Sequence, residues 1–336
     1  MRNGFPLIFT AIVLFTVSAA AQTPAPLAKA SPGSSKTWTP TRTPDGHPSL
    51  EGIWTNSTMT PLERPRALGD KAFFTPQEAA ARDKQTLEEV STDRRDGPAE
   101  VDVNRSYNEL WRERGHLLLR TSLIVDPPDG RLPALTPEGQ KRAQARAEDR
   151  RRRGPDPADS WTDRNLAERC ITRGAPKLPG GYNNNFQIYQ TRNSVVIVQE
   201  MIHEARVIRM DGSPHPDPKI RLWMGDSIGH WEGDTLVVDT TNYNDKIVDN
   251  SFNCCPGAGS GLHVVERFRR VDADRIDYRY TIEDPNTYTR PWTAEVPMTR
   301  TDEPIYEYAC HEGNYALLDI LKGARAKEAE AAAKKK

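Results

Sequence analysis

The chain has 336 residues, with 46 Lys and Arg against 47 Asp and Glu, a net charge of -1 and a mean hydropathy of -0.72. A nucleic-acid-binding surface needs an excess of basic charge, so the balanced charge argues against nucleic acid as a partner. The length allows one large domain, or one domain with a helical appendage.

The N-terminus has the features of a secretory signal peptide. Arg2 precedes an apolar run over residues 5–17, and the small residues that follow place the cleavage site near Ala21. We therefore assign residues 1–21 to a signal peptide, with a retained N-terminal anchor as the alternative. No other run approaches membrane length, so we expect a periplasmic or extracellular protein without a stable membrane span. Residues 22–45, rich in Ala, Pro, Ser and Thr, predict a disordered leader.

Residues 46–169 predict a mixed helical and β-hairpin region packed on the core. Thr75-Pro76-Gln77-Glu78 combines an N-cap, a proline at the first helical position and a capping-box glutamate, which predicts a helix over 76–90. Thr136-Pro137-Glu138 repeats the signal and predicts a helix that continues to Arg153. The apolar run 117–125, followed by a Pro- and Gly-containing turn, predicts a strand and a reversal.

Residues 170–322 predict the core domain, which is mainly β. Short β-prone runs joined by tight turns favour an antiparallel meander that closes as a lipocalin-like barrel or stacks as a sandwich, with the preceding helices as N-terminal decorations. In the run 275–283 apolar and polar residues alternate, which indicates one buried and one solvated face. Residues 323–336 predict a charged helical tail. The candidate strands are 186–191, 194–200, 205–210, 220–224, 235–241, 263–271, 275–283 and 292–299.

Four cysteines allow three disulfide pairings in an oxidising compartment: Cys170, Cys254, Cys255 and Cys310. Adjacent cysteines rarely bond each other because the eight-membered ring strains the backbone. A bridge between Cys170 and Cys310 would tie the two ends of the β region together, and would stabilise the fold by about 4–5 kcal/mol. Zinc is the alternative, although no Cys-x-x-Cys spacing supports it.

The segment 223–242 concentrates tryptophan, histidine and carboxylates around glycine turns. His230 and Glu232 lie two apart, on one face of an extended chain, and Asp226 precedes them in a glycine-bounded turn. His203 is the other candidate base, so we assign catalysis to His203, Asp226, His230 and Glu232. Arg206 could hold an anionic substrate group.

Aromatic and further polar residues of the β region are candidates for substrate binding, because aromatic rings with polar edges stack on ligands. They are Trp223, Trp231, His263 and Trp292.

Two other interpretations of the same residues remain open. His203, His215 and His230 with a carboxylate have the ligand types of a zinc or iron site, but neither His-x-His nor His-Glu-x-x-His spacing occurs, so the cofactor stays unknown. Asp and Gly at turns also form hydrogen-bonded networks with no functional role. The Gly-Asp-Ser sequence ending at Ser227 lacks the strand–turn–helix context of a serine hydrolase.

Several blocks of the chain resemble a family of uncharacterised secreted bacterial proteins. The resemblance covers nearly the whole chain that follows the predicted signal peptide, and it brings no established activity. It favours Cys170–Cys310 as the structural pair. The blocks are 43–46, 50–54, 124–131, 200–206, the GDSIGHWEGDTLVVDTTN block 225–242, 284–292 and the YACHEGN block 308–314.

The sequence thus predicts a secreted or periplasmic protein that binds a small organic molecule in a β-barrel pocket near residues 200–232. His/Asp acid–base catalysis of the hydrolase or lyase type is its enzymatic interpretation. A non-catalytic small-ligand carrier and an envelope-associated structural protein are the alternatives. The sequence gives no indication of the oligomeric state.

Overall fold

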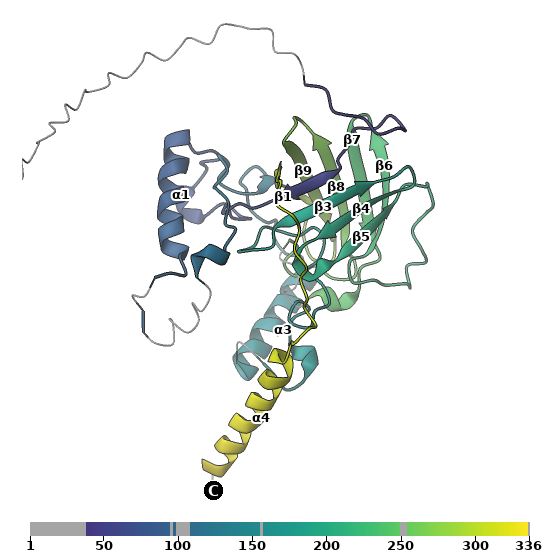
Figure 1. Cartoon of the computed structure of the whole chain (residues 1–336). Coiled ribbons are helices and arrows are strands. Elements are labelled where there is room, and N and C mark those ends of the chain that lie inside the picture. Colours follow the sequence, from purple (N-terminus) through teal and green to yellow (C-terminus); the bar gives the residue numbers. More distant parts are fainter. Residues whose placement is uncertain (1–37, 95–96, 99–107, 155–156, 249–253, 335–336) are drawn as a thin grey trace, which may run out of the picture. The chain divides into compact units, whose positions relative to one another are not determined.

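The computed structural model describes residues 38–94, 97–98, 108–154, 157–248 and 254–334 (Figure 1). The predicted signal peptide and most of the predicted leader lie outside these ranges. Residues from Trp38 onward form one compact unit. In the part of the chain that the structure describes, no helix combines the length and the apolar composition needed to cross a membrane.

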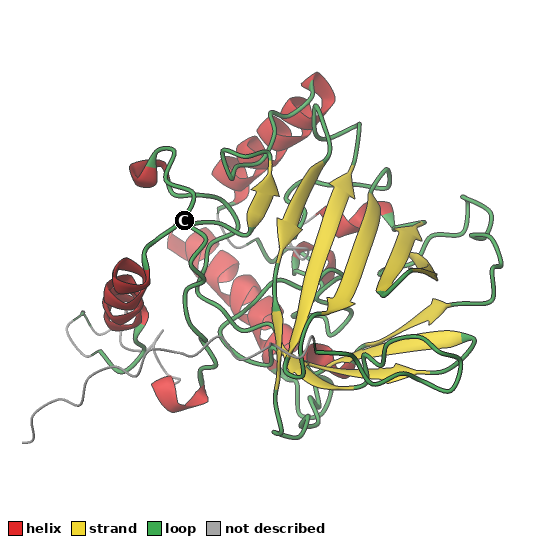
Figure 2. Ribbon diagram, turned by 90° about the horizontal axis from the view of Figure 1, so that it is seen from above, coloured by secondary structure: helices red, strands yellow, loops and turns green. Residues whose placement is uncertain are grey.

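Nine strands close into a barrel, seen from above in Figure 2. The last of them, β11, pairs with both β9 and β1 and so joins the two ends of the sheet. The prediction of a mainly β fold is confirmed. Of the two predicted arrangements of the strands, a barrel or a sandwich, the structure has the barrel. The strands are β1 (Gly52–Thr55), β3 (Asn185–Gln190), β4 (Ser194–Gln199), β5 (Ala205–Arg209), β6 (Asp226–Glu232), β7 (Thr235–Thr241), β8 (His263–Arg270), β9 (Arg275–Glu283) and β11 (Met298–Arg300).

Two further strands extend the sheet beyond β9. The predicted strand 292–299 is divided into β10 (Trp292–Glu295) and β11, and β10 pairs with β9 and carries β2 (Ile124–Asp126) at the edge. Only the end of the predicted strand 117–125 is therefore a strand. The rest bonds irregularly to neighbouring loops, as in the hydrogen bond of 2.7 Å from Phe74 N to Leu119 O.

The sheet departs from an antiparallel meander at one place. β5 and β6 are parallel, with Ile208 opposite Ser227 and Arg209 opposite Ile228. A parallel pair cannot be joined by a tight turn, so the loop 210–225 leaves the end of β5 and turns back beside it before β6 begins. The strand predicted at 220–224 is part of this loop, where Leu222 makes an isolated bridge to Tyr243.

The two helices predicted before the core are confirmed. α1 (Pro76–Val90) has the expected capping box, in which Thr75 and Glu78 exchange side-chain and backbone hydrogen bonds of 2.9 and 3.2 Å. α3 (Pro137–Arg153) is capped by Thr136. α4 (Ala316–Lys334) begins before the predicted tail. Short 3₁₀ turns lie at Arg66–Leu68, Glu109–Trp111, Trp161–Asp163, Met201–His203 and Asp245–Val248.

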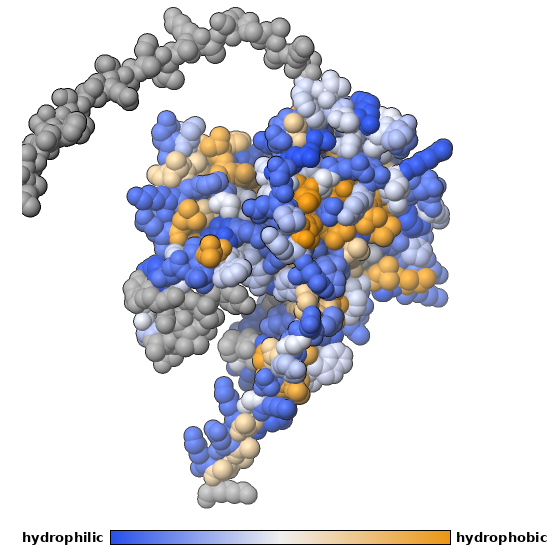
Figure 3. All heavy atoms as spheres, viewed as in Figure 1, coloured by the Kyte–Doolittle hydropathy of each residue, from blue (hydrophilic) through white to orange (hydrophobic). Residues whose placement is uncertain are grey.

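Alternating side chains divide the barrel wall into an inner and an outer face. On β9 the residues Ile276, Tyr278, Tyr280 and Ile282 are buried inside, as the sequence predicts. Outside, β3 to β5 keep some apolar residues in contact with solvent (Figure 3), among them Val207. The interior is filled largely by side chains, as in other small barrels.

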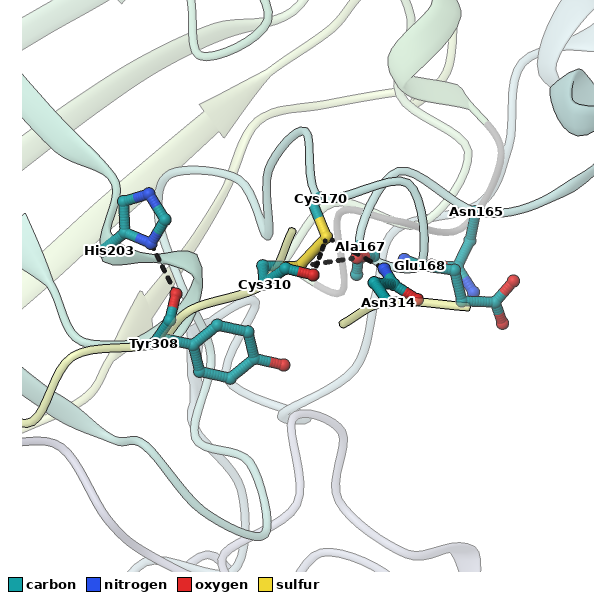
Figure 4. Close-up of a disulfide and its surroundings, with 8 residues drawn as sticks. All are labelled: Asn165, Ala167, Glu168, Cys170, His203, Tyr308, Cys310 and Asn314. Carbon is teal, nitrogen blue, oxygen red and sulfur yellow. Dashed lines mark hydrogen bonds between the residues drawn. A yellow bond between two sulfur atoms is a disulfide. The ribbon is translucent and has the colours of Figure 1, made fainter. Parts of the chain in front are cut away.

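Both pairs of cysteines form disulfides. Cys170 and Cys310 are joined with an S–S distance of 2.00 Å, and Asn314 Nδ2 lies 3.3 Å from the Cys170 sulfur (Figure 4). This pairing is the one that the family resemblance favours. Cys254 and Cys255 are also bonded, so the expectation that neighbouring cysteines stay apart is wrong. The pair is buried in a turn, where the bend of the backbone accommodates the ring.

Candidate functional site

Two histidines alternate with three carboxylates on the outer face of the barrel. His215 lies between Asp226 and Asp239, with Nδ1–Oδ2 and Nε2–Oδ1 distances of 2.7 and 2.9 Å. His263 lies between Asp239 and Glu283, with Nε2–Oδ2 and Nδ1–Oε2 distances of 2.8 and 3.0 Å. Asp239 therefore bridges the two imidazoles, and we call these five residues the histidine–carboxylate cluster.

The strand period places the three strand carboxylates and His263 on the outside. Asp239 lies between the buried residues Val238 and Thr240, and His263 precedes the buried Val264. The register of β8 and β9 sets His263 directly opposite Glu283. Side chains that are distant in sequence meet because adjacent strands carry them on the same face.

The loop 210–225 supplies His215. Asn242 at the end of β7 fastens this loop, because its amide nitrogen lies 2.9–3.3 Å from the carbonyl oxygens of Pro216, Asp217 and Ile220. Gly225 ends the loop with a φ of 70°, and a Cβ there would lie 2.5 Å from the Thr241 carbonyl. The return of the chain beside β7 thus depends on glycine.

The carboxylates determine the charge of the cluster. Hydrogen bonding to Asp239, with a further contribution from Glu283, raises the pKa of His263 to about 9 against the opposing effect of burial. The His263 hydrogen bond in turn lowers the pKa of Asp239, helped by His215. His263 is therefore an imidazolium at neutral pH. Arg209 adds a positive charge at the other end, with Nη2 at 2.7 Å from Asp226.

A cleft of about 510 Å³ opens beside the cluster. Its polar wall includes both histidines and Arg221, whose Nη1 donates to the Ser260 carbonyl at 2.9 Å. Its apolar wall includes Leu262 and three prolines of the loop, Pro214, Pro216 and Pro218. Apolar walls with a few convergent polar groups are typical of small-molecule sites of about 300–1,000 Å³.

A second polar centre lies inside the barrel. Arg206 makes two hydrogen bonds to Glu266, of 2.6 and 3.0 Å, and Tyr278 donates to the same carboxylate at 2.7 Å. Burial acts to lower the pKa of Arg206, but Glu266 more than offsets it and raises the value. The ion pair leaves no net positive charge for the anionic substrate group that the sequence assigned to Arg206. The adjoining cavity has about 20 Å³, roughly the space of one water molecule.

The other predicted catalytic residues lie outside the cluster. His203 is exposed, and its Nδ1 lies 2.6 Å from the Tyr308 carbonyl oxygen (Figure 4). His230 and Glu232 share a face of β6 as predicted and lie 3.3 Å apart, but both are exposed and Glu232 also contacts Arg267. Of the four, only Asp226 belongs to the histidine–carboxylate cluster.

The predicted substrate-binding residues are also divided. His263 lines the cleft, whereas the three tryptophans do not. Trp292 is fully buried against Tyr280 and Tyr288, Trp231 stacks on His47 with 4.8 Å between ring centroids, and Trp223 packs against the core. The three tryptophan rings therefore pack against other side chains of the protein and not against the cleft.

Sequence reasoning missed Asp239 and Glu283, and it weighed His215 only as a metal ligand. Asp239 belongs to the outward face of an amphipathic strand, and its partners become visible only when the register of β7, β8 and β9 is known. Among the described ranges no three His, Cys, Asp or Glu residues are placed to hold a metal ion. In the cluster, both ring nitrogens of each histidine are hydrogen-bonded to carboxylate oxygens.

Comparison of the chain with protein-family models, with curated proteins and with solved structures finds no match. The function is therefore inferred from the geometry of the site.

Proposed function

We propose that the protein binds a small organic molecule in the cleft beside His215 and His263, and that the cluster exchanges a proton with it in a hydrolase or lyase type of reaction. One observation carries the proposal: two imidazoles that share the Asp239 carboxylate both line a cleft of ligand size. The barrel interior is a second candidate site, but its cavity of about 20 Å³ is too small for an organic ligand of ordinary size.

Differences in exposure indicate which proton is exchanged. The side chain of Glu283 is 44 % exposed, against 34 % for Asp239 and 16 % for Asp226, so Glu283 is the partner that solvent and ligand reach most easily. A ligand group that replaces Glu283 can accept the Nδ1 proton of His263. Asp239 keeps its bond to Nε2 and holds the neutral ring in place, as a carboxylate does behind a catalytic histidine.

We further infer that the protein acts outside the cytoplasm. The N-terminal sequence has the pattern of a signal peptide, and all four cysteines are paired, as is common in oxidising compartments.

A pair of matched variants tests where the ligand binds. Ser260→Trp places an indole at the rim of the cleft, and Ala273→Trp places one in the turn between β8 and β9. Both residues are exposed, and both backbone carbonyls accept a hydrogen bond from an arginine. We expect native mass spectrometry of protein purified from its producing cells, or a screen of small carboxylic acids and esters, to give a ligand that Ser260→Trp loses and Ala273→Trp retains. A ligand retained by both variants would refute the cleft.

Proton exchange needs a separate test. His263→Gln should abolish turnover of that ligand, and should leave its binding within about tenfold, because the substitution removes the proton and keeps a polar side chain. Undiminished turnover in His263→Gln would refute the role of His263, whereas a wild-type protein that binds the ligand and leaves it unchanged would be a non-catalytic carrier.

A further inference from the structure

A short segment closes one side of the interior cavity and places Lys177 there. Three buried side chains hold this segment through its backbone carbonyls, at 2.9–3.2 Å: Asn56 on Lys177, Tyr243 on Ala175 and Gln199 on Gly174. Ala175, Pro176 and Lys177 consequently line the same cavity as Glu266 and Tyr278.

Lys177 is buried without an ion-pair partner. The residue is 8 % exposed, and its Nζ donates to Asn184 Oδ1 at 3.2 Å and lies 5.6 Å from the centre of the Phe186 ring. Among the described residues the hydrogen-bond partner of Nζ is thus a neutral amide oxygen and not a carboxylate. Lysine is rarely buried unless it is paired, so a structural role alone does not account for this position.

The charged groups around Lys177 oppose each other. Burial and, to a smaller extent, Arg173 lower the pKa of its amine, Glu113 and Glu200 raise it, and the net value is about 8. Across the cavity, Arg206 and Glu266 form a neutral pair. A part of the Lys177 population therefore carries a free amine at neutral pH, and a desolvated amine of this kind is a nucleophile for carbonyl carbon.

The cavity also offers acceptors that have no partner. Asn56 Oδ1 and Gln199 Oε1 make no hydrogen bond, although both side chains are more than nine-tenths buried and both line the cavity. Buried polar oxygens without a donor are rare, and a bound molecule with a hydroxyl or an N–H group would supply the missing hydrogen bonds. The cavity volume of about 20 Å³ limits such a molecule to the atom that bonds to Nζ and one or two further heavy atoms.

We propose that Lys177 condenses with a one- or two-carbon aldehyde that enters the interior cavity. The amine lone pair attacks the carbonyl carbon, the C=O π pair moves to oxygen, and a proton passes from nitrogen to that oxygen to give a carbinolamine. The remaining N–H proton then passes to the hydroxyl group, which leaves as water as the nitrogen lone pair forms the C=N bond, so aldehyde and amine give imine and water. Asn56 Oδ1 and Gln199 Oε1 can accept from the carbinolamine hydroxyl and from the released water.

Reductive methylation of the full chain with formaldehyde and cyanoborohydride tests the proposal. At pH 7 an amine with a pKa of about 8 has a neutral fraction about 300-fold larger than one at 10.5. We expect peptide mass spectrometry at low conversion to show Lys177 modified at least tenfold faster than the exposed Lys219 of the same sample. The Lys177 rate should fall about tenfold for each pH unit below 7. Equal rates, or a slower rate at Lys177, would overturn the proposal.

A second aldehyde tests the cavity. Benzaldehyde is too large for about 20 Å³, so its use should remove the advantage of Lys177 over Lys219. An advantage that persists with benzaldehyde would show that the amine reacts outside the cavity. The wild-type protein supplies both measurements, so neither depends on the folding of a variant, and Lys177→Arg serves to confirm the assignment of the fast site.

Discussion

Replacing His263 by glutamine should destabilise the protein below pH 7 and have little effect above pH 10. The pKa of His263 is raised from its ordinary 6.5 to about 9 in the folded protein, so the folded state binds the proton more tightly than the unfolded chain does. The resulting stabilisation is fully present below pH 6.5 and is lost as the pH rises through 9.

The structure sets the size of this effect. One pKa unit corresponds to about 1.36 kcal/mol, so the difference of 2.5 between the two pKa values corresponds to about 3.4 kcal/mol. The ring is 31 % exposed, and solvent screening weakens partly exposed pairs, so we expect about half of that value, about 1.5–2 kcal/mol. The variant also leaves Asp239 and Glu283 without the positive charge between them.

Urea unfolding of wild type and His263→Gln at pH 6, 7.5 and 10, without reductant, measures the difference. Leu262→Ala is the control, because this buried neighbour of His263 contributes apolar packing and should cost about 2–4 kcal/mol at every pH. If His263→Gln lost the same free energy at pH 6 and at pH 10, the imidazolium would have no stabilising role and the reasoning would fail.

Three further changes test the barrel itself. Arg206→Met should cost about 3–5 kcal/mol by leaving Glu266 charged and unpaired in the core, whereas the double variant with Glu266→Leu should recover most of that loss; equal costs would refute a true ion pair. Removing the Cys170–Cys310 bridge with serines should lower the free energy of unfolding by about 2–5 kcal/mol, and an unchanged urea midpoint would show that the bridge adds nothing. Gly225→Ala should cost more than about 1 kcal/mol, because a Cβ meets a β7 carbonyl at 2.5 Å; a neutral result would mean that the loop adjusts freely.

Local patterns predicted much of the fold. The capping box at Thr75 and Glu78 and the cap at Thr136 are satisfied within four residues, so they fix helix starts without tertiary information. The alternation along 275–283 likewise identifies the buried face of β9, because the period of two is a property of the strand alone. The number of such strands and their tight turns predicted a barrel or a sandwich, and the pairing of β11 with both β1 and β9 decides for the barrel.

The parallel pairing of β5 and β6 could not be predicted in the same way. Its register depends on the partner strand, and the apolar run at 220–224 has the composition of a strand although its main-chain groups bond in a loop. The pairing of His230 with Glu232 illustrates the same limit: their common face was predictable from spacing, but its exposure to solvent was set by the barrel. Asp239 and His263 meet only through the register of β7 and β8.

The parallel step also explains why a site forms at this place. A tight turn after β5 would have left no loop over the outer faces of β6 and β7, whereas the loop 210–225 brings His215 to Asp226 and Asp239. Two different kinds of contact then hold the loop. The hydrogen bonds from the Asn242 amide group are independent of pH, whereas the contacts of His215 involve a carboxylate that it shares with His263. Loss of the His263 proton near pH 9 removes a positive charge from beside Asp239 and leaves the hydrogen bonds of Asn242 unaffected. The loop that forms the apolar wall of the cleft and the histidine that carries the proton therefore contact the same carboxylate, Asp239.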